Sequence, residues 1–426
     1  MALLCQIVRR ADVYPPSCLG DSMTSRWGIL AVLFAVRATM GFQFQSVAAV
    51  APILMRDAGI GLADIGLLIG LYLAPGVAVA LPGGALGRRF GDKTIVLFGL
   101  ALMALGGLLM AFWPSWTGQV AGRLIAGLGG VLLNVLMSKM VTDWFAGREI
   151  ASAMAIFVNS WPVGIAAALV VLPAAGSAFG VAAVHIISAI VIGVGCVLLS
   201  LLYRAPPSVA SLPVGGSSPT GRALAAVLLA GAVWSLYNVG FAMIFGFGPA
   251  MLAERGWAVA AAGTAVSIVM WVTMLSVPAG GFMADWSRRH IAIIVAGCVL
   301  FAGALLVAAR TEAVVASFVV LGIVCGVPAG PIMSLPARVL GPETRSIGMG
   351  IYFTVFYAGM FVAPAAAGWL AARLGGASAA FDFGAAAVLC AGLLAWIFPR
   401  LAASISVPSL TTVPRAATSV SGAAKS

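Results

Sequence analysis

Long apolar stretches, separated by short polar connections, run through almost the whole of this chain. The hydrocarbon core of a bilayer is about 30 Å thick, and a helix crosses it with roughly 20 apolar residues. Stretches such as 95–113 and 291–309 meet that length without one charged residue. The pattern predicts an all-α membrane protein with twelve transmembrane helices, near 28–54, 63–86, 94–113, 117–141, 151–172, 179–203, 223–247, 260–284, 291–309, 313–335, 346–370 and 381–399.

The distribution of positive charge orients these helices. Hydrophobic residues make up 62% of the chain and charged residues only 8%, which excludes an ordinary soluble domain. Of the 23 Lys and Arg residues, 17 belong to the termini and the even-numbered connections, if Lys139 in the last turn of the fourth span is counted with them. Four lie in the odd-numbered connections, and Arg37 and Arg123 lie within spans. The positive-inside rule therefore predicts that both termini are cytoplasmic. We expect the membrane to be the inner membrane of a bacterium. The net charge of +11 belongs to this rim beside the lipid bilayer, so no nucleic-acid partner is expected.

The two halves of the sequence repeat each other at a constant offset of 197 residues. The offset aligns proline with proline, glycine with glycine and arginine with arginine, as in Pro52/Pro249, Gly66/Gly263 and Arg148/Arg345. It predicts two six-helix bundles in the same orientation, an arrangement typical of transporters with a site between the halves. We expect a cytoplasmic N-terminal tail at 1–26, bundles at 27–203 and 223–400, a cytoplasmic linker at 204–222 and a disordered cytoplasmic tail at 401–426.

A glycine-rich basic motif lies in the second connection, at 84–93 (GALGRRFGDK), and returns in the eighth, at 281–289 (GFMADWSRR). Both resemble the cytoplasmic loop signature G-x-L-x-D-R-x-G-R-[RK] of the major facilitator superfamily. Arg123, Gly127 and Gly129 also match that family's R-x-x-x-G-x-G pattern. The resemblance implies a transporter whose halves rock around a central site. Within the family, the residues around Arg37 loosely resemble bacterial cyanate, nitrate and monocarboxylate-type porters.

The resemblance assigns a gating or structural role to one set of residues. A short basic loop can pair with carboxylates and with helix C-terminal carbonyls, and so hold neighbouring helix ends together. Arg88 stands where the family has Asp, so either Asp92 supplies the carboxylate or this latch is weaker. The alternative is that the basic residues serve only to orient the chain during insertion. The set is Gly84, Arg88, Arg89, Gly91, Asp92, Lys93, Arg123, Gly281, Asp285, Arg288 and Arg289.

Arg37 is the strongest candidate for contact with a substrate. It follows Trp27 by ten residues, so it lies about 15 Å into the first predicted helix, where a charge costs about 3 kcal/mol. No Asp or Glu lies deep inside a predicted span, and a free guanidinium is suited to bidentate capture of an anion. Two alternatives are hydrogen bonds to the carbonyls of a broken helix and a span shifted toward the cytoplasm.

Other polar and aromatic residues are candidates for the same site. Spans 1 and 7 line the cavity in the resembled family, so we expect Arg37 to face Trp234 and Asn238. Arg123 lies nearer the outer end of span 4, where a structural or coupling role is expected. Each remaining candidate could equally be an interhelical hydrogen-bonding or packing group; they are Gln43, Gln45, Asn134, Asn159, Tyr237, Trp271, Tyr352 and Tyr357.

The leading functional hypothesis is a secondary active transporter of a small organic or inorganic anion, working by alternating access as a monomer. The alternative is a multidrug or hydrophobic-compound efflux transporter, which the aromatic residues Trp234 and Trp271 would favour. An enzyme is not expected, because HExxH, GxSxG and P-loop patterns are absent from the sequence. The six cysteines lack metal-ligand spacing, and no cofactor is expected.

Few residues of the sequence are candidates for coupling transport to an ion. A proton-driven exporter of cations usually carries an acidic residue within the membrane, and this sequence has none at depth. His185 is the only histidine within a predicted span, and we expect it to make a local hydrogen bond. Coupling to either a proton or a counter-anion therefore stays open.

Overall fold

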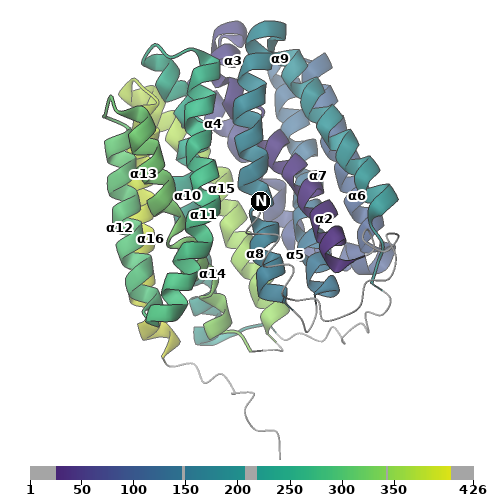
Figure 1. Cartoon of the computed structure of the whole chain (residues 1–426), viewed down its shortest axis with the longest axis vertical. Helices are drawn as coiled ribbons and strands as arrows, with labels where there is room; N and C mark the ends of the chain where they lie inside the picture. Colours follow the sequence, from purple (N-terminus) through teal and green to yellow (C-terminus); the bar gives the residue numbers. More distant parts are fainter. Residues whose placement is uncertain (1–24, 146–148, 207–217, 342–343, 404–426) are drawn as a thin grey trace, which may run out of the picture.

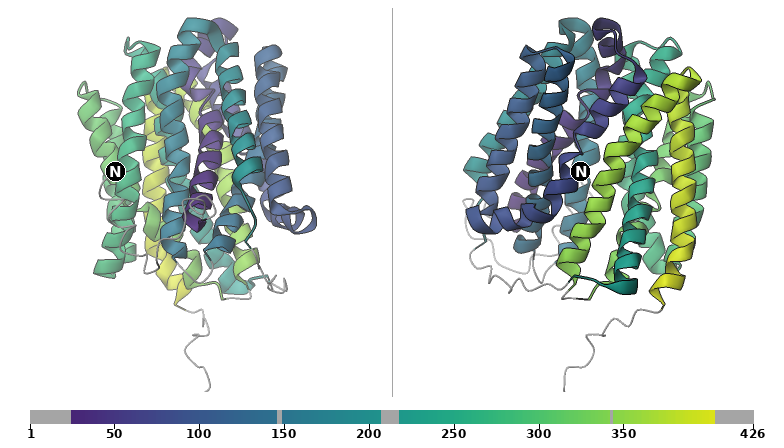
Figure 2. Two further views of the ribbon diagram at one scale, coloured as in Figure 1. Left: turned by 45° about the vertical axis from the view of Figure 1, so that its right-hand side comes forward. Right: turned by 180° about the vertical axis from the view of Figure 1, so that it is seen from behind.

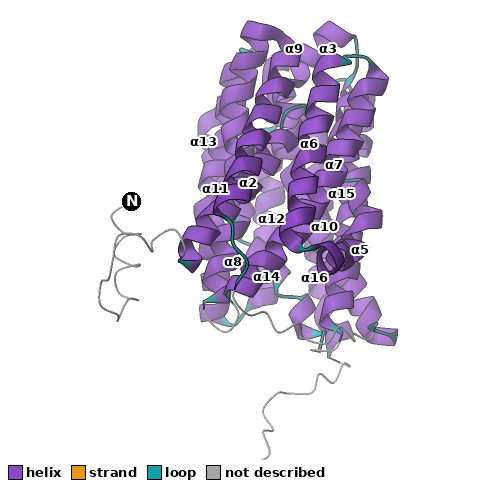
Figure 3. Ribbon diagram, turned by 90° about the vertical axis from the view of Figure 1, so that its right-hand side faces the viewer, coloured by secondary structure: helices purple, strands orange, loops and turns teal. Residues whose placement is uncertain are grey.

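The computed structural model describes residues 25–145, 149–206, 218–341 and 344–403. The predicted N-terminal tail up to residue 24, most of the predicted linker and the predicted tail beyond residue 403 lie outside the described residues. In the described part of the chain every regular element is a helix, and the long helices run roughly side by side (Figures 1 and 3).

The N-terminal half is built from α2 to α9. Its elements are α2 (Arg26–Phe44), the 3-10 turn η1 (Ala48–Val50), α3 (Ala51–Ala58), α4 (Leu62–Leu71), α5 (Pro75–Phe90), α6 (Asp92–Phe112), α7 (Trp116–Trp144), α8 (Ile150–Val158) and α9 (Ser160–Leu202). The first predicted span, 28–54, is therefore too long, because α2 ends at Phe44. The second is broken before Pro75, whose ring nitrogen cannot donate a helical hydrogen bond.

The C-terminal half is built from α10 to α16. Its elements are α10 (Gly221–Glu254), α11 (Val259–Ser287), α12 (His290–Ala308), α13 (Val314–Gly326), α14 (Ala329–Met333), the 3-10 turn η2 (Pro336–Arg338), α15 (Arg345–Leu374) and α16 (Ser378–Ala402). The right-hand view of Figure 2 shows the two halves next to each other, purple and blue beside green and yellow.

The expectation of an all-α membrane protein with twelve crossings is confirmed. Eleven helical segments among the described residues are long and apolar enough to span a membrane. The segment containing α9 includes two crossings, because the chain reverses at Gly180, whose φ of +79° suits glycine. The predicted loop at 173–178 is wrong: the helix continues through it and the turn comes at Gly180.

Glycines bring the two halves into close contact. A methyl group on Gly66 of α4 would lie 2.1 Å from the carbonyl oxygen of Pro364, and one on Gly70 would lie 2.1 Å from that of Phe361, both on α15. A methyl group on Gly263 of α11 would lie 2.3 Å from the carbonyl oxygen of Leu169 on α9. Small residues permit such backbone approach between helices in lipid.

The two ends of the bundle differ in their elements. We call "basic end" the end at which α2 begins, α5 ends and α16 ends, which is the lower end in Figure 1. The α3 helix and the turn within α9 lie at the opposite end. Gly66 lies near the opposite end, because it comes shortly after the start of α4. Arg37 is eleven residues into α2, so it lies about 16 Å from the basic end.

Candidate functional site

The guanidinium of Arg37 occupies a helix break. Its Nη1 donates to the carbonyl oxygens of Phe157 and Val158 and to the hydroxyl of Ser160, each at 3.1 Å. Helix α8 ends at Val158 and α9 starts at Ser160. The positive charge therefore lies at a helix C-terminus, where the helix dipole favours a cation. This geometry matches the alternative in which Arg37 bonds to the carbonyls of a broken helix.

The break itself follows from the sequence around Asn159. In a continuous helix the backbone N–H of residue 162 would donate to the carbonyl of Val158. Residue 162 is proline, which has no N–H, so that carbonyl is left free to accept from Arg37. Asn159 is the half-buried residue between the two helices, next to two of the groups that bind the guanidinium.

A chain of hydrogen bonds connects Arg37 to the other half of the protein. Arg37 Nε donates to Asn134 Oδ1 at 3.1 Å, and Asn134 Nδ2 donates to Tyr357 Oη at 2.9 Å. Tyr357 belongs to α15 and is 1% exposed, and its ring lies directly over Gly76, where a methyl group would come within 2.3 Å. Asn134 on α7 is therefore shared between the cation of one half and the phenol of the other.

An aromatic cluster continues from Tyr357 into the C-terminal half. The ring of Phe356 lies 5.1 Å from that of Tyr357 and 6.2 Å from that of Trp234 on α10. The indole Nε1 of Trp234 is buried and has no hydrogen-bond partner among the described residues. A polar N–H therefore lies within an otherwise apolar wall, in contact with the chain that starts at Arg37.

Arg123 makes a similar but more complete set of contacts. Its side chain is 0% exposed, and it donates to the carbonyl oxygens of Leu68 at 2.8 Å, Phe44 at 3.0 Å and Gln43 at 3.4 Å. Phe44 is the last residue of α2 and Leu68 lies in the last turn of α4, so this guanidinium meets two helix C-termini. It also lies over the rings of Tyr72 and Phe44, at 4.9 and 5.8 Å.

The other sequence candidates are not all brought to Arg37. Gln43 is fully buried and its amide donates to the carbonyl of Met103. Gln45 reaches the other half, donating to the carbonyl of Phe245 at 2.7 Å. Asn238 donates to the carbonyl of Trp234 within its own helix. The remaining three lie elsewhere in the C-terminal half: Tyr237 bonds to the carbonyl of Cys325, Tyr352 contacts Met333 Sδ, and Trp271 is 45% exposed.

Some groups at the site were not among the predicted residues. Ser160, Phe356 and the carbonyls of Phe157 and Val158 contact Arg37 or Tyr357. The Asn-Ser-Trp-Pro sequence at 159–162 is the signal that could have revealed the helix break. The contact with Tyr357 across the halves has no comparable signal in the sequence.

The first basic loop connects helix ends of the N-terminal half through helix C-terminal carbonyls and through the carboxylate of Asp92. Lys93 Nζ donates to the carbonyls of Ser200 and Tyr203 at the C-terminal end of α9, at 2.8 and 2.9 Å. Asp92 pairs at 2.5 Å with Lys139, which also binds Asp143. Gly91 has a φ of +86°, which permits the turn. Gly84 and Arg88 belong to α5, and the contacts predicted for them lie outside what the structure describes.

The second copy of the loop differs. Asp285 pairs with His290 at 3.1 Å, and Arg288 and Arg289 are exposed. Gly281 has open space at its Cβ position. Arg89 in the first copy lies over the ring of Phe90. Within the described residues, each ion pair of the two loops stays within its own half.

The expectation of a local hydrogen bond for His185 is wrong. The side chain is 0% exposed, and neither ring nitrogen has a hydrogen-bond partner among the described residues. His185 is packed within α9, and it does not extend the polar chain at Arg37.

Comparisons with known proteins cover most of the chain. A family model described as Major Facilitator Superfamily matches residues 33–248 and again 223–419. The chain is 29% identical over 147 residues to the Inner membrane transport protein YajR of Escherichia coli (strain K12), which is 34% of this chain and 31% of that protein. It is also 29% identical over 232 residues to the Probable multidrug-efflux transporter Rv1634 of Mycobacterium tuberculosis (strain ATCC 25618 / H37Rv), 53% of this chain and 44% of that one.

The chain thus spans less than half the length of each of these curated relatives. Among solved structures, the POT family transporter PepTSo superimposes with a TM-score of 0.70 at 14% identity. That match covers 89% of this chain and 99% of the other. Its fold is therefore similar to that of the present chain.

Proposed function

The chain belongs to the major facilitator superfamily, and from this premise we propose that it is a secondary active transporter of a small organic anion. The family resemblance drawn from the loop motifs is confirmed, and the named relatives are transporters and not enzymes. The narrower resemblance to cyanate, nitrate and monocarboxylate-type porters is not confirmed by these matches. The substrate class is inferred from Arg37 and its surroundings.

The difference in charge compensation between the two intramembrane arginines supports an anionic substrate. A helix C-terminus carries roughly half a negative charge. Arg123 meets two such ends, which together offset about one positive charge, whereas Arg37 meets one. None of the ion pairs in the described part of the chain includes Arg37, and its side chain is only half-buried. The observation that carries the proposal is this partly compensated, partly accessible cation at mid-depth.

The neighbouring aromatic groups favour an organic anion over an inorganic one. A carboxylate at Arg37 could also accept hydrogen bonds from Asn134 Nδ2 and from Tyr357 Oη. An apolar body attached to it could lie against Phe356 and Trp234, which continue the contact chain into the other half. Small-molecule binding sites typically combine one charged residue that fixes the ligand's orientation with apolar side chains that line the rest of the pocket.

Substrate binding at Arg37 would also change the contact between the two halves. Alternating access requires that the bound substrate change the contacts between the two halves. Asn134 Nδ2 contacts the opposite half at Tyr357, so a carboxylate that takes this amide competes with the contact between the halves. Of the two hydrogen bonds that join the halves in the described part of the chain, this is the one adjacent to Arg37.

The chain is a multi-pass membrane protein, and we propose that it resides in a bacterial inner membrane with both termini in the cytoplasm. The relative from Escherichia coli named for the inner membrane and the excess of Lys and Arg at the basic end support this. Cysteine labelling from either side of intact cells at the basic end would test the orientation.

Efflux of hydrophobic compounds is the second candidate function. The relative named as a probable multidrug-efflux transporter and the aromatic cluster of Trp234, Phe353 and Phe356 favour it. In this case the aromatic wall would bind the substrate and Arg37 would serve only to stabilise the helix break. A lipophilic cation would then be a transported compound.

The experiment is uptake into liposomes containing the purified protein. The panel comprises labelled aromatic and aliphatic carboxylates, nitrate, phosphate and a lipophilic cation, each with and without a pH gradient. We expect saturable uptake of a carboxylate, reduced at least tenfold in Arg37→Lys because the planar fork is lost while the charge is kept. Arg310→Lys is the matched control, because Arg310 forms a bidentate pair with Asp382 at the exposed opposite end. Transport of the cation alone, or full uptake in Arg37→Lys, would reject an anion bound by Arg37.

A further inference from the structure

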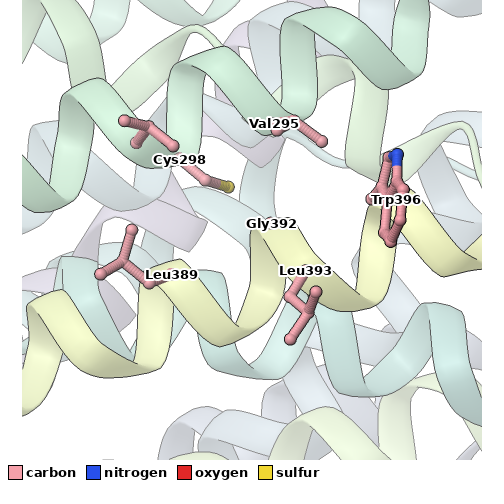
Figure 4. A pocket seen from close by; sticks show the side chains of 7 residues that line it. Val295, Cys298, Leu389, Gly392, Leu393 and Trp396 are labelled. Carbon is pink, nitrogen blue, oxygen red and sulfur yellow. The ribbon is translucent and has the colours of Figure 1, made fainter.

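An apolar groove lies on the outer surface of the C-terminal half, between α12 and α16 (Figure 4). Its volume is about 280 Å³. The buried Cys298 and Gly392 form its floor, and exposed side chains surround it. These surrounding residues are Val299, Leu389, Leu393 and Trp396, each between 46% and 55% exposed, with Val295 beside them.

The depth of the groove corresponds to the acyl chains of one leaflet. A methyl group on Gly392 would lie 3.1 Å from Cys298 Cβ, so these two residues are opposite each other on antiparallel helices. Eight residues separate Cys298 from His290, the first residue of α12, which places the floor roughly 12 Å from the basic end. Half of a hydrocarbon core is about 15 Å thick. The groove therefore extends from near mid-bilayer toward the headgroups at the basic end.

Two arginines lie at the level of the mouth of the groove along the helix axes. Eight residues after Gly392 the chain reaches Arg400, which is consequently level with His290 and close to Arg289 in the register of the two helices. Arg400 Cζ lies 4.4 Å from the centre of the Trp396 ring, and both arginines are exposed. The carboxylate of Asp285 lies 3.1 Å from His290 Nε2. Tryptophan is typical of the membrane interface, where its ring lies at headgroup level.

We propose that this groove binds one anionic phospholipid. One acyl chain occupies the groove over Gly392 and Cys298, and the phosphate contacts Arg400 and Arg289. Charge selects an anionic lipid over a zwitterionic one, since basic residues next to a membrane attract anionic headgroups. The apolar surround of exposed side chains suits an acyl chain, and none of its lining residues takes part in the contacts of Arg37. The inference holds whatever the transported substrate is.

The opposite end of the bundle provides a matched control. Arg373 lies 4.7 Å from the centre of the Trp369 ring, and Trp369 is 53% exposed, as Trp396 is. The two pairs share the same spacing of four residues and the same stacking. The Arg373 pair belongs to α15 and lies near the start of α16 instead of its end, away from the residues that line the groove.

The experiment is native mass spectrometry of the protein released from nanodiscs with equal amounts of phosphatidylglycerol and phosphatidylcholine. For the wild type we expect one retained phosphatidylglycerol, at least threefold more often than phosphatidylcholine. The double variant Arg289→Gln/Arg400→Gln should lower this ratio to about one. Leu389→Trp, which fills the groove from its exposed side, should reduce retention of both lipids at least threefold. Arg373→Gln should change neither value.

Three outcomes would overturn the proposal. The first is equal retention of the two lipids by the wild type. The second is unchanged lipid retention in Leu389→Trp, which would show that no acyl chain occupies the groove. The third is a loss of the preference for phosphatidylglycerol in Arg373→Gln as large as that in the double variant. This result would show that the overall charge of the protein, and not this groove, causes the preference. All the substituted side chains are exposed, so folding is expected to be retained, and size-exclusion chromatography of each variant checks it.

Discussion

Arg123 and Arg37 each place a guanidinium within the membrane interior without a carboxylate partner among the described residues, and they are stabilised to different degrees. Arg123 is fully buried and donates to three carbonyls at the ends of α2 and α4. Arg37 donates to two carbonyls at one helix end, to Ser160 and to Asn134, and stays half-buried. The comparison teaches that helix C-termini can replace acidic residues. We propose that the degree of replacement separates a structural cation, Arg123, from a ligand-binding one, Arg37.

The largest expected effect is the loss of Arg123. In Arg123→Met the carbonyls of Leu68, Phe44 and Gln43 lose their donor in a dry interior, and each unsatisfied buried group costs about 1–3 kcal/mol. We expect little folded protein, or a strongly lowered thermal unfolding midpoint in detergent. Arg123→Lys keeps the charge but cannot reach all three carbonyls, so its midpoint should be intermediate. A wild-type midpoint in Arg123→Met would mean that the cation does not hold these helix ends together.

Arg37→Met should separate stability from activity. The helix break is half-exposed, so water can replace many of the hydrogen bonds that the guanidinium donates. We therefore expect a loss of about 1 kcal/mol in the free energy of unfolding. Uptake of the transported anion should nevertheless be abolished. The measurements are thermal unfolding of this variant beside Arg123→Met, and uptake in liposomes. A destabilisation as large as that of Arg123→Met would make both arginines structural and end the distinction.

Tyr357→Phe should have a moderate effect on transport and a small one on folding. It removes only the hydroxyl that accepts from Asn134, a hydrogen bond of about 0.5–1.5 kcal/mol, which corresponds to a two- to tenfold change in transport kinetics. Tyr352→Phe is the control, because among the described residues that hydroxyl contacts Met333 Sδ, at 3.5 Å and within the same half. Initial uptake rates over a range of substrate concentrations provide the test. Equal effects of the two changes would remove any special role for the contact across the halves.

Lys93→Gln should have the smallest effect of the four. Lys93 also binds helix C-terminal carbonyls, those of Ser200 and Tyr203, but at the edge of the bundle, where water is available. Capping of this kind in an exposed setting contributes about 0.3–1 kcal/mol. The unfolding midpoint of Lys93→Gln should therefore stay close to the wild type. If the midpoint fell as far as that of Arg123→Met, burial would not explain why Arg123 and Lys93 differ in their contribution to stability.

Much of the fold could be predicted because membrane insertion requires long apolar helices. The twelve crossings and the two halves follow from helix length and from the repeat, and only the positions of breaks and turns differ. Pro75 interrupts span 2 through its missing N–H, and Gly180 makes the turn between spans 5 and 6 in place of the expected loop at 173–178. Local backbone chemistry determines such breaks, and average hydropathy does not report it.

The site was predictable only in part. Arg37 is evident because a charge at that depth needs an explanation, and Asn134 and Tyr357 were among several polar candidates. The sequence does not say which of these candidates meet, because Asn134 and Tyr357 are 223 residues apart and belong to different halves. Equally polar residues such as Gln43 and Tyr237 are satisfied by backbone carbonyls elsewhere. Only the packing of helices decides between these outcomes.

The most direct test of the central claim is binding of a carboxylate to the purified protein, measured as a shift in the thermal unfolding midpoint. A ligand that binds the folded state raises this midpoint with its concentration. We expect a transported carboxylate to raise the midpoint of the wild type and of Arg310→Lys, and to leave that of Arg37→Lys unchanged at the same concentrations. An equal rise in Arg37→Lys and in the wild type would contradict the assignment of Arg37 as the anion ligand.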